Sequence, residues 1–405
     1  MRHEEQVRLI KQLCAHLDAG TTVDAGGVRM MATTSYVDRA IAEREWNEFF
    51  LAGPQCVGLS QDLPEPGAFL TNDDLGVPIL ATRAADGSFK AFVNSCRHRG
   101  ALVETAERGV ARRFTCPFHA WAYDTSGALV GLPKPEHFGI VDHLCLGLRP
   151  LAAEERHGLL FVHPDPDGVI DLDELLGRWF DDEFSTWGFD RMQPLTRDAY
   201  DTACNWKLAM DTFGETYHFP VLHRNTLFNG FHGNVQLHDE EGHLHRMILC
   251  KRDIDAMRLL PEEHWDITVA GLPVYWIFPN TIVMPFEAGV FLVRAYPDRS
   301  DPGHHVSRID FYIKPDFGGT DGRKPELDEF MSDIAHRFAN IIRDEDYVMA
   351  ASQQTAANAG VLDHVVFGRN EPTLHHYHDT YRRKLGEEPL ALLDDLVGLQ
   401  QPNGL

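Results

Sequence analysis

The chain has 405 residues and lacks the features of a membrane or disulfide-stabilised protein. No apolar run reaches the roughly 20 residues that a membrane-spanning helix needs. The first 17 residues are charged and contain no apolar stretch of the signal-peptide type. The 7 cysteines are odd in number and scattered, so they indicate no disulfide framework. We therefore expect a soluble protein of the reducing cytoplasm.

Positive charge is also scarce, because 37 Lys and Arg residues stand against 61 Asp and Glu residues, for a formal net charge of −24. Nucleic acids and anionic membranes are bound by basic faces. We therefore expect neither as a partner. The apolar content of 43% is sufficient for well-packed cores, and the length favours two or more domains.

Two cysteines and two histidines form the most informative pattern in the chain. Cys96 and His98 form C-x-H, and after seventeen residues Cys116 and His119 form C-x-x-H. A [2Fe–2S] cluster with two Cys ligands on one iron and two His ligands on the other is a Rieske centre. The alternative is a structural zinc site, but zinc loops usually begin with C-x₂₋₄-C and end with H-x₃₋₅-H. The mixed loops and the one-residue spacing favour the Rieske centre.

The flanking residues, C-R-H-R-G and C-P-F-H-A-W-x-Y-D-x-x-G, resemble the Rieske domain of ring-hydroxylating oxygenase α subunits. The resemblance extends over roughly residues 45–385. Together with helical apolar spacing before residue 50, it predicts three parts. These are a helical lead-in at 1–50, a Rieske [2Fe-2S] domain at 51–168 and a catalytic non-haem Fe(II) domain at 169–405. Short β-branched and aromatic runs between turn residues predict that the second part is all-β. In the third part strands precede long helices, which favours an α+β class with an antiparallel sheet, the helix-grip fold of this family.

A second cluster of metal-ligand residue types follows in the third part. We expect a helix that begins near Trp206, stops at Pro220 and carries Glu215 and His218 on one face. His223 follows the proline and can turn back towards His218. Two imidazoles and one carboxylate form the 2-His-1-carboxylate triad that holds non-haem Fe(II) and leaves open positions.

This segment resembles the N-W-K…[DE]-x-x-H-x₄-H signature of the same α subunits, which implies that His218 and His223 bind the iron. The family's third ligand is an Asp on a late helix, and the spacing from Asp346 to Gln354 matches its setting, with Asp344 as the rival. The resemblance also implies a role for Glu215. Its carboxylate would bridge a Rieske histidine of a neighbouring subunit, the equivalent of His119, to His218 and orient both rings.

The activity that the resemblance implies is O₂-dependent hydroxylation of an aromatic or other hydrophobic small molecule, as in the catabolism of aromatic compounds. Ring dihydroxylation and monohydroxylation both stay open, and oxidative O- or N-demethylation is the alternative within the family. An alternative of another class is a Rieske electron carrier without catalysis. The implied partners are a ferredoxin or an NAD(P)H-dependent reductase, and the implied assembly is a head-to-tail homotrimer, with or without a β subunit.

Five arginines lie in or near the Rieske motif: Arg97, Arg99, Arg108, Arg112 and Arg113. The sequence leaves two interpretations of them open. They either form a local patch that docks an acidic electron donor or are ordinary solvated loop charges.

Seven further histidines are predicted to be surface or loop residues: His232, His238, His243, His245, His264, His304 and His305.

The apolar segment 273–286, together with Phe213, Leu227 and Phe228, is a candidate lining for a substrate pocket, although core packing explains it equally well.

Overall fold

The computed structural model describes residues 1–139, 145–318 and 324–393, and the chain divides into two compact units. The smaller unit contains Asn47–Asp171 and Gly188–Gln193. The larger unit contains Met1–Trp46, Leu172–Trp187 and Pro194–Leu405. The residues predicted as a helical lead-in therefore cluster mainly with the larger unit.

The smaller unit is built from short antiparallel strands. They are β2 (Gln55–Leu59), β3 (Ala68–Asn72), β4 (Ile79–Arg83), β5 (Phe89–Val93), β6 (Arg108–Val110), β7 (Arg113–Thr115), β8 (Ala122–Asp124), β9 (Leu129–Gly131), β10 (Pro150–Leu151), β11 (Ala153–Arg156) and β12 (Leu159–Val162). Five form a sheet of order β10–β5–β4–β3–β6, and two three-stranded sheets have the orders β11–β12–β2 and β7–β8–β9. The loops that follow β5 and β7 carry the two halves of the Cys/His motif.

A seven-stranded antiparallel sheet of order β13–β19–β18–β17–β16–β15–β14 forms the centre of the larger unit. Its strands are β13 (Gln193–Thr202), β14 (Phe231–Glu241), β15 (Leu244–Lys251), β16 (Gly271–Ile277), β17 (Thr281–Pro285), β18 (Gly289–Pro297) and β19 (His305–Ile313). The middle strands are buried on both faces, so they appear in the sequence as continuous apolar runs. This arrangement, with the long helices described next, confirms the predicted α+β class.

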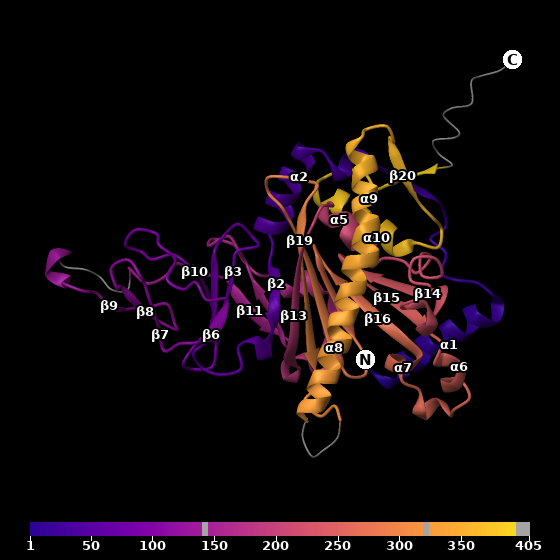
Figure 1. Cartoon of the computed structure of the whole chain (residues 1–405), viewed down its shortest axis with the longest axis horizontal. Coiled ribbons are helices and arrows are strands. Elements are labelled where there is room, and N and C mark those ends of the chain that lie inside the picture. The colour runs from indigo at the N-terminus through magenta and orange to yellow at the C-terminus, as the bar shows by residue number, and fades with distance from the viewer. Residues whose placement is uncertain (140–144, 319–323, 394–405) are drawn as a thin grey trace. The chain divides into compact units, whose positions relative to one another are not determined.

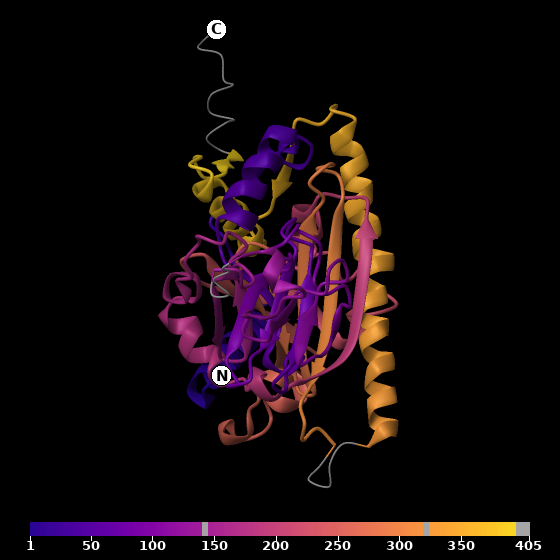
Figure 2. The ribbon, with the colours of Figure 1, turned by 90° about the vertical axis from the view of Figure 1, so that its left-hand side faces the viewer.

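Helices cover both faces of this sheet. They are α1 (His3–Ala19), α3 (Leu172–Leu176), α4 (Arg178–Phe184), α8 (Pro325–Ile341), α9 (Tyr347–Asn358) and α10 (Pro372–Lys384). On one face, Phe338 of α8 packs on Phe291 at a ring separation of 4.4 Å, and Tyr377 of α10 packs on Trp276 at 4.7 Å. On the other face, α1 joins the core cluster that contains Ile248. Figures 1 and 2 show the long α8–α9 helix running along one side of the sheet.

Smaller elements complete the larger unit. A three-stranded sheet of order β20–β1–β21 joins the two ends of the chain through β1 (Arg29–Ala32), β20 (His364–Phe367) and β21 (Ala391–Leu392). The short helices are α2 (Arg39–Glu45), α5 (Trp206–Asp211), α6 (Ile254–Met257) and α7 (Ile267–Ala270). In the described part of the chain, no helix is both long enough and apolar enough to cross a membrane.

The prediction of a helix from Trp206 to Pro220 was wrong, because α5 ends at Asp211 and turns follow. Two features oppose continuation of the helix. Gly214 is a poor helix former, and it lies so close to Leu374 of α10 that a Cβ atom would collide with it. The Glu215 carboxylate accepts the backbone N–H groups of Tyr217 and His218, and such local acceptors compete with helical hydrogen bonds.

The prediction that the additional histidines are surface or loop residues was wrong for two of them. His245 on β15 is 1% exposed and His305 on β19 is fully buried. The Nδ1 atoms of His245 and His376 lie 2.9 Å apart, and His376 Nε2 lies 3.2 Å from the Gly242 carbonyl oxygen. His305 Nδ1 lies 2.9 Å from the Cys204 carbonyl oxygen. Both are core histidines bonded through Nδ1, while within the described residues the Nε2 atom of each is buried without a hydrogen-bond partner. Sequence patterns do not separate such residues from solvated ones.

Candidate metal centres

The two loops of the Cys/His motif have the same backbone hydrogen bonds. Cys96 N donates to the Ala101 carbonyl at 2.8 Å, and Cys116 N donates to the Trp121 carbonyl at 2.8 Å. Each cysteine carbonyl in turn accepts a backbone hydrogen bond: Gly100 N donates to the Cys96 carbonyl at 2.9 Å, and Ala120 N donates to the Cys116 carbonyl at 3.0 Å. The last residue of each turn has a positive φ, 78° at Gly100 and 58° at Ala120. Two equivalent turns therefore each present one thiol and one imidazole.

The side chains of these loops suit a cluster held by two thiolates and two imidazoles. Cys96 and Cys116 are buried, and neither forms a disulfide. The His98 and His119 ring centroids lie 4.6 Å apart. Within the described residues, the Nδ1 atom of His98 is buried without a hydrogen-bond partner. The Trp121 ring stacks on His98 at 5.0 Å and limits its rotation.

Zinc fits these loops less well than a dinuclear cluster. Four ligands of one tetrahedral ion lie within a few ångströms of one another. Among the described residues, one group of His, Cys, Asp and Glu has its ligand atoms within 4.8 Å of one another, and it lies in the larger unit. Two cysteines and two histidines are the ligand set of a Rieske cluster, in which one iron is held by the cysteines and the other by the histidines.

Tyr123 on β8 is a contributor to this site that was not singled out from the sequence. Its hydroxyl lies 3.3 Å from Cys96 Sγ and accepts the Arg97 amide at 3.0 Å. Burial raises the pKa of Tyr123, and the neighbouring Cys96 raises it further, so the hydroxyl keeps its proton. Tyr123 stands in the motif as part of its Y-D pair, but its contact with Cys96 follows only from the geometry of the loop.

The second group consists of His218, His223 and Asp346. Oδ1 of Asp346 lies 3.5 Å from Nε2 of His218 and 3.2 Å from Nε2 of His223. The two imidazole rings are 4.9 Å apart. Three candidate ligand atoms thus face one point, as the predicted triad requires. Asp344, the rival acid, is exposed and pairs with Arg343 at 2.6 Å.

The electrostatics of this group favour a bound cation. Burial opposes ionisation of Asp346, but hydrogen bonds from His218 and His223 outweigh it and hold the pKa of Asp346 below its ordinary value. Burial lowers the pKa of His218, yet its bonds to Asp346 and Glu215 raise it to about 9. Without a metal a proton is stabilised between these groups, and a divalent cation can replace it.

Carboxylates hold the outer nitrogens of both histidines. Glu215 Oε1 is hydrogen-bonded to Nδ1 of His218, and Glu345 Oε2 lies 2.7 Å from Nδ1 of His223. Glu345 was not singled out from the sequence. Because each Nδ1–H is engaged, Nε2 is the atom of each ring that faces the common point, and it would give up its proton when a metal binds. These contacts are consistent with a metal site whose ligand orientation is set in advance.

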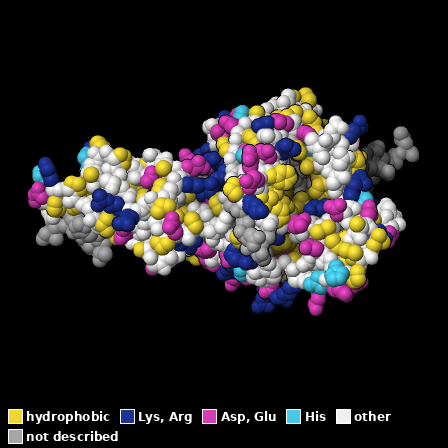
Figure 3. Space-filling view, turned by 60° about the horizontal axis from the view of Figure 1, so that its bottom comes forward, with side chains coloured by type: hydrophobic (Ala, Val, Ile, Leu, Met, Phe, Trp, Pro, Cys, Tyr) yellow, Lys and Arg dark blue, Asp and Glu magenta, His cyan; other side chains and the backbone are white. Residues whose placement is uncertain are grey.

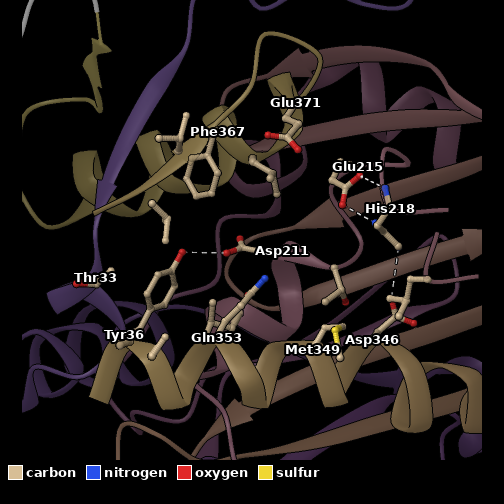
Figure 4. A pocket seen from close by; sticks show the side chains of 18 of the residues that line it. Thr33, Tyr36, Asp211, Glu215, His218, Asp346, Met349, Gln353, Phe367 and Glu371 are labelled. Carbon is tan, nitrogen blue, oxygen red and sulfur yellow. Dashed lines mark hydrogen bonds and ion pairs between the residues drawn. The ribbon is translucent and has the colours of Figure 1, made fainter. Parts of the chain in front are cut away.

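The three-residue group stands between two cavities. One, of about 490 Å³, is lined by Glu215, His218 and Asp346 and also by two further acids, Asp211 and Glu371. Figure 4 shows these carboxylates around the cavity, with Asp211 hydrogen-bonded to Tyr36. The other cavity, of about 60 Å³, is narrow and apolar and reaches His223 and Asp346 from the sheet side.

Two domain-family models match the chain. The model described as "Rieske [2Fe-2S] domain" matches residues 53–145, and the model "Ring hydroxylating alpha subunit (catalytic domain)" matches residues 189–387.

Curated relatives match in two ways. The chain is 34% identical over 198 residues to biphenyl 2,3-dioxygenase subunit alpha of Rhodococcus jostii, which covers 45% of this chain but only 41% of that protein. It is 24% identical over 353 residues to the carnitine monooxygenase oxygenase subunit of Acinetobacter baumannii, covering 86% of this chain and 88% of the relative. The first match spans less than half of the relative's length.

Solved structures show the same fold. The quaternary ammonium Rieske monooxygenase CntA in complex with L-carnitine aligns with a TM-score of 0.73 at 18% identity, over 89% of this chain and 96% of that chain. A naphthalene 1,2-dioxygenase mutant bound to phenanthrene aligns with a TM-score of 0.70 at 18% identity, over 91% and 94% of the two chains. The two domain-family matches together show that the chain belongs to the Rieske oxygenase family and joins a Rieske [2Fe–2S] domain to the catalytic mononuclear-iron domain of ring-hydroxylating α subunits.

Proposed function

We propose that this chain is the oxygenase component of an O₂-dependent system that hydroxylates an uncharged, hydrophobic small molecule. The observation that carries the proposal is the convergence of His218, His223 and Asp346 beside an apolar cavity. The chain also contains a Rieske domain. An electron carrier would need the Rieske domain alone, so the match to the catalytic domain argues against that alternative.

Each motif has a defined part in this proposal. The ligand sets are Cys96, His98, Cys116 and His119 for the [2Fe–2S] cluster, and His218, His223 and Asp346 for Fe(II). When bound, the cluster supplies single electrons and the mononuclear iron activates O₂. The residues around the iron site fix the ligand rings through Glu215 and Glu345 and exclude water from the apolar side.

The narrow cavity supports an apolar substrate. Its side chains other than those at the metal site are, with Thr212 as the exception, all hydrophobic: Phe213, Phe219, Leu227, Phe231, Met247, Leu249, Leu272, Val274, Met284, Phe338 and Ile342. The acids that line it, Glu215 and Asp346, are already engaged by the histidines. Because burial of a charged group without a partner is costly, an uncharged molecule fits this lining best.

A second candidate function is oxidation of a quaternary ammonium compound. The carnitine monooxygenase oxygenase subunit supports it, because that relative is matched over 88% of its length. The described lining of the narrow cavity contains no Lys or Arg that would pair with the carboxylate of a carnitine-like substrate. This absence argues against a carnitine-like substrate in the narrow cavity.

We also propose that electrons pass between copies of the chain in a homotrimer, after delivery by a ferredoxin or reductase. The Glu215 carboxylate contacts His218 on one side and lines the larger cavity on the other. His119 is exposed on its loop in the smaller unit. A second copy that placed His119 in the larger cavity would complete a hydrogen-bonded link through Glu215.

The test is a substrate screen with the purified protein, a generic ferredoxin and reductase, NADH and isotopically labelled O₂. Mass spectrometry should show labelled oxygen in products of uncharged one-ring aromatic compounds and none in carnitine incubations. Oxygenation of quaternary ammonium compounds alone would instead establish the second candidate. Cluster reduction without any product from either class would contradict oxygenation of both kinds.

A further inference from the structure

Two consecutive acids contact opposite sides of one imidazole ring. Nδ1 of His223 lies 2.7 Å from Oε2 of Glu345, and Nε2 of the same ring lies 3.2 Å from Oδ1 of Asp346. The His223 side chain is 1% exposed and Asp346 is buried, whereas Glu345 is about one quarter exposed. Two adjacent residues of one helix therefore contact the two nitrogens of the His223 ring.

The local helix geometry explains how neighbouring side chains reach the same ring. Consecutive side chains of an α-helix point about 100° apart. Between α8 and α9, residues Ile342–Asp346 instead form a π-helical turn, in which the wider turn brings neighbours closer in direction. Such turns are frequent at functional sites. Here the turn directs both Glu345 and Asp346 at His223.

A second contact fixes the Glu345 carboxylate. The Thr226 hydroxyl donates to the same Oε2 atom at 2.9 Å. Thr226 belongs to the turn that follows His223, and its amide donates to the His223 carbonyl at 3.0 Å. Glu345, Thr226 and His223 thus form a closed set of contacts that ties the π-helical turn to the histidine-bearing segment.

We infer that Glu345 is a positioning residue of the mononuclear metal site, which holds His223 in the Nδ1–H tautomer so that its Nε2 lone pair faces the metal beside Asp346. This inference rests on the proposed function. A ligating histidine whose outer N–H is bonded to a carboxylate is oriented and is a stronger base. Glu345 lines neither of the two cavities, so its role is separate from that of Glu215, which lines both.

The test compares Glu345→Ala and Glu345→Gln with the native chain, using Asp344→Asn as a matched control. Asp344 is the adjacent exposed acid and pairs only with Arg343 among the described residues. Purified protein with an intact Rieske cluster is depleted of mononuclear iron, and Co²⁺ or Fe²⁺ is titrated against a chelator. We expect Glu345→Ala to weaken the affinity about 10- to 100-fold.

Glu345→Gln keeps an acceptor oxygen and should fall between native and alanine. The visible spectrum of the Co²⁺ form should change in Glu345→Ala, because His223 is free to rotate, and the Rieske absorption should not. Thr226→Val should shift the affinity in the same direction by a smaller factor, and it serves if Glu345→Ala fails to fold.

Native-like metal affinity and Co²⁺ spectra in all three variants would overturn the inference while leaving the proposed function intact. A native chain that binds no mononuclear metal would instead overturn the proposed function and the inference with it. Loss in Asp344→Asn equal to that in Glu345→Ala would show a general charge effect and also reject the positioning role.

Discussion

At the scale of single residues, the Asp346 carboxylate brings its helix together with His218 and His223. The interval from Asp346 to Gln354 in the sequence pointed to this acid. The interval has a structural reason, because Gln354 accepts the Asn205 amide at 2.8 Å and so ties α9 to the start of α5. Ligation of iron by Asp346 stays a prediction. Glu345 was missed because its contact depends on a π-helical turn that no sequence pattern announces.

Glu215→Gln tests the proposed bridge. The amide keeps the shape of the side chain but lacks the negative charge that accepts from His218 and, in our proposal, from His119 of a second copy. We expect both metals to stay bound and product formation to slow by about 10- to 100-fold. Stopped-flow measurement of cluster oxidation in the presence of substrate and O₂ reports the step directly. Turnover at the native rate would exclude the bridge.

Tyr123→Phe tests the hydrogen bond to Cys96. A hydroxyl that donates to a cluster-bound sulfur stabilises the more negative, reduced state, so its removal should lower the reduction potential, by an amount on the order of tens of millivolts. A redox titration followed by the Rieske absorption measures the change. An unchanged or raised potential would mean that the hydroxyl does not donate to the sulfur.

At the scale of elements, strands and long helices were predictable where burial gives a clear pattern. The apolar runs at 89–93 and 244–251 predict strands and coincide with β5 and β15, and the helical spacing over 373–385 is followed closely by α10. The segment after α5 was not predictable, because its course depends on the contact of Gly214 with Leu374 and on the caps from Glu215. Both are tertiary or side-chain effects that override local helical spacing.

The contact between α10 and β15 should make the protein sensitive to acid. Burial lowers the pKa of His376 to about 4 from its ordinary 6.5, and burial lowers the pKa of His245 as well. Between pH 6.5 and 4 the unfolded chain binds a proton on His376 that the native state excludes. The free energy of unfolding should therefore fall as the pH falls through this window, by about 3 kcal/mol at most for His376.

Urea unfolding at several pH values measures this effect, with His376→Gln as the variant and the exposed His264→Gln as the control. The variant should show a flatter pH dependence than the native chain, and the control should match the native chain. Equal slopes for all three proteins would show that His376 is not responsible. Glu240, whose pKa is lowered to about 2 by His238, adds an acid-sensitive contribution below pH 4.5.

At the scale of the whole molecule, the net charge of −24 coexists with a local excess of arginine near the Rieske loops. On the face drawn in Figure 3, basic side chains are interspersed with acidic ones. Arg108 is half-buried and pairs with Asp62 at 2.9 Å, so it is a structural residue. Arg97, Arg99, Arg112 and Arg113 are all exposed. Arg97 and Arg99 flank His98 on its loop, so these two are the first candidates for docking an electron donor.

Arg97→Glu and Arg99→Glu should raise the KM for an acidic reduced ferredoxin several-fold at low salt, and the difference should shrink as salt screens the charges. Arg39→Glu, an exposed site in the larger unit, is the control and should leave the KM unchanged. Steady-state reduction of the Rieske absorption gives the KM. Identical KM values for all variants would mean that the electron donor docks at another surface.

The central claim is that one polypeptide holds two kinds of iron centre. The most direct test is metal and sulfide analysis with EPR of anaerobically purified protein, comparing the native chain with His218→Ala. The account predicts about three irons and two acid-labile sulfides per native chain, with a Rieske signal on reduction and a second, high-spin signal on addition of nitric oxide. His218→Ala should keep the Rieske signal and lose the high-spin one. A native chain with two irons and no nitric oxide signal, or with zinc in place of iron, would contradict it.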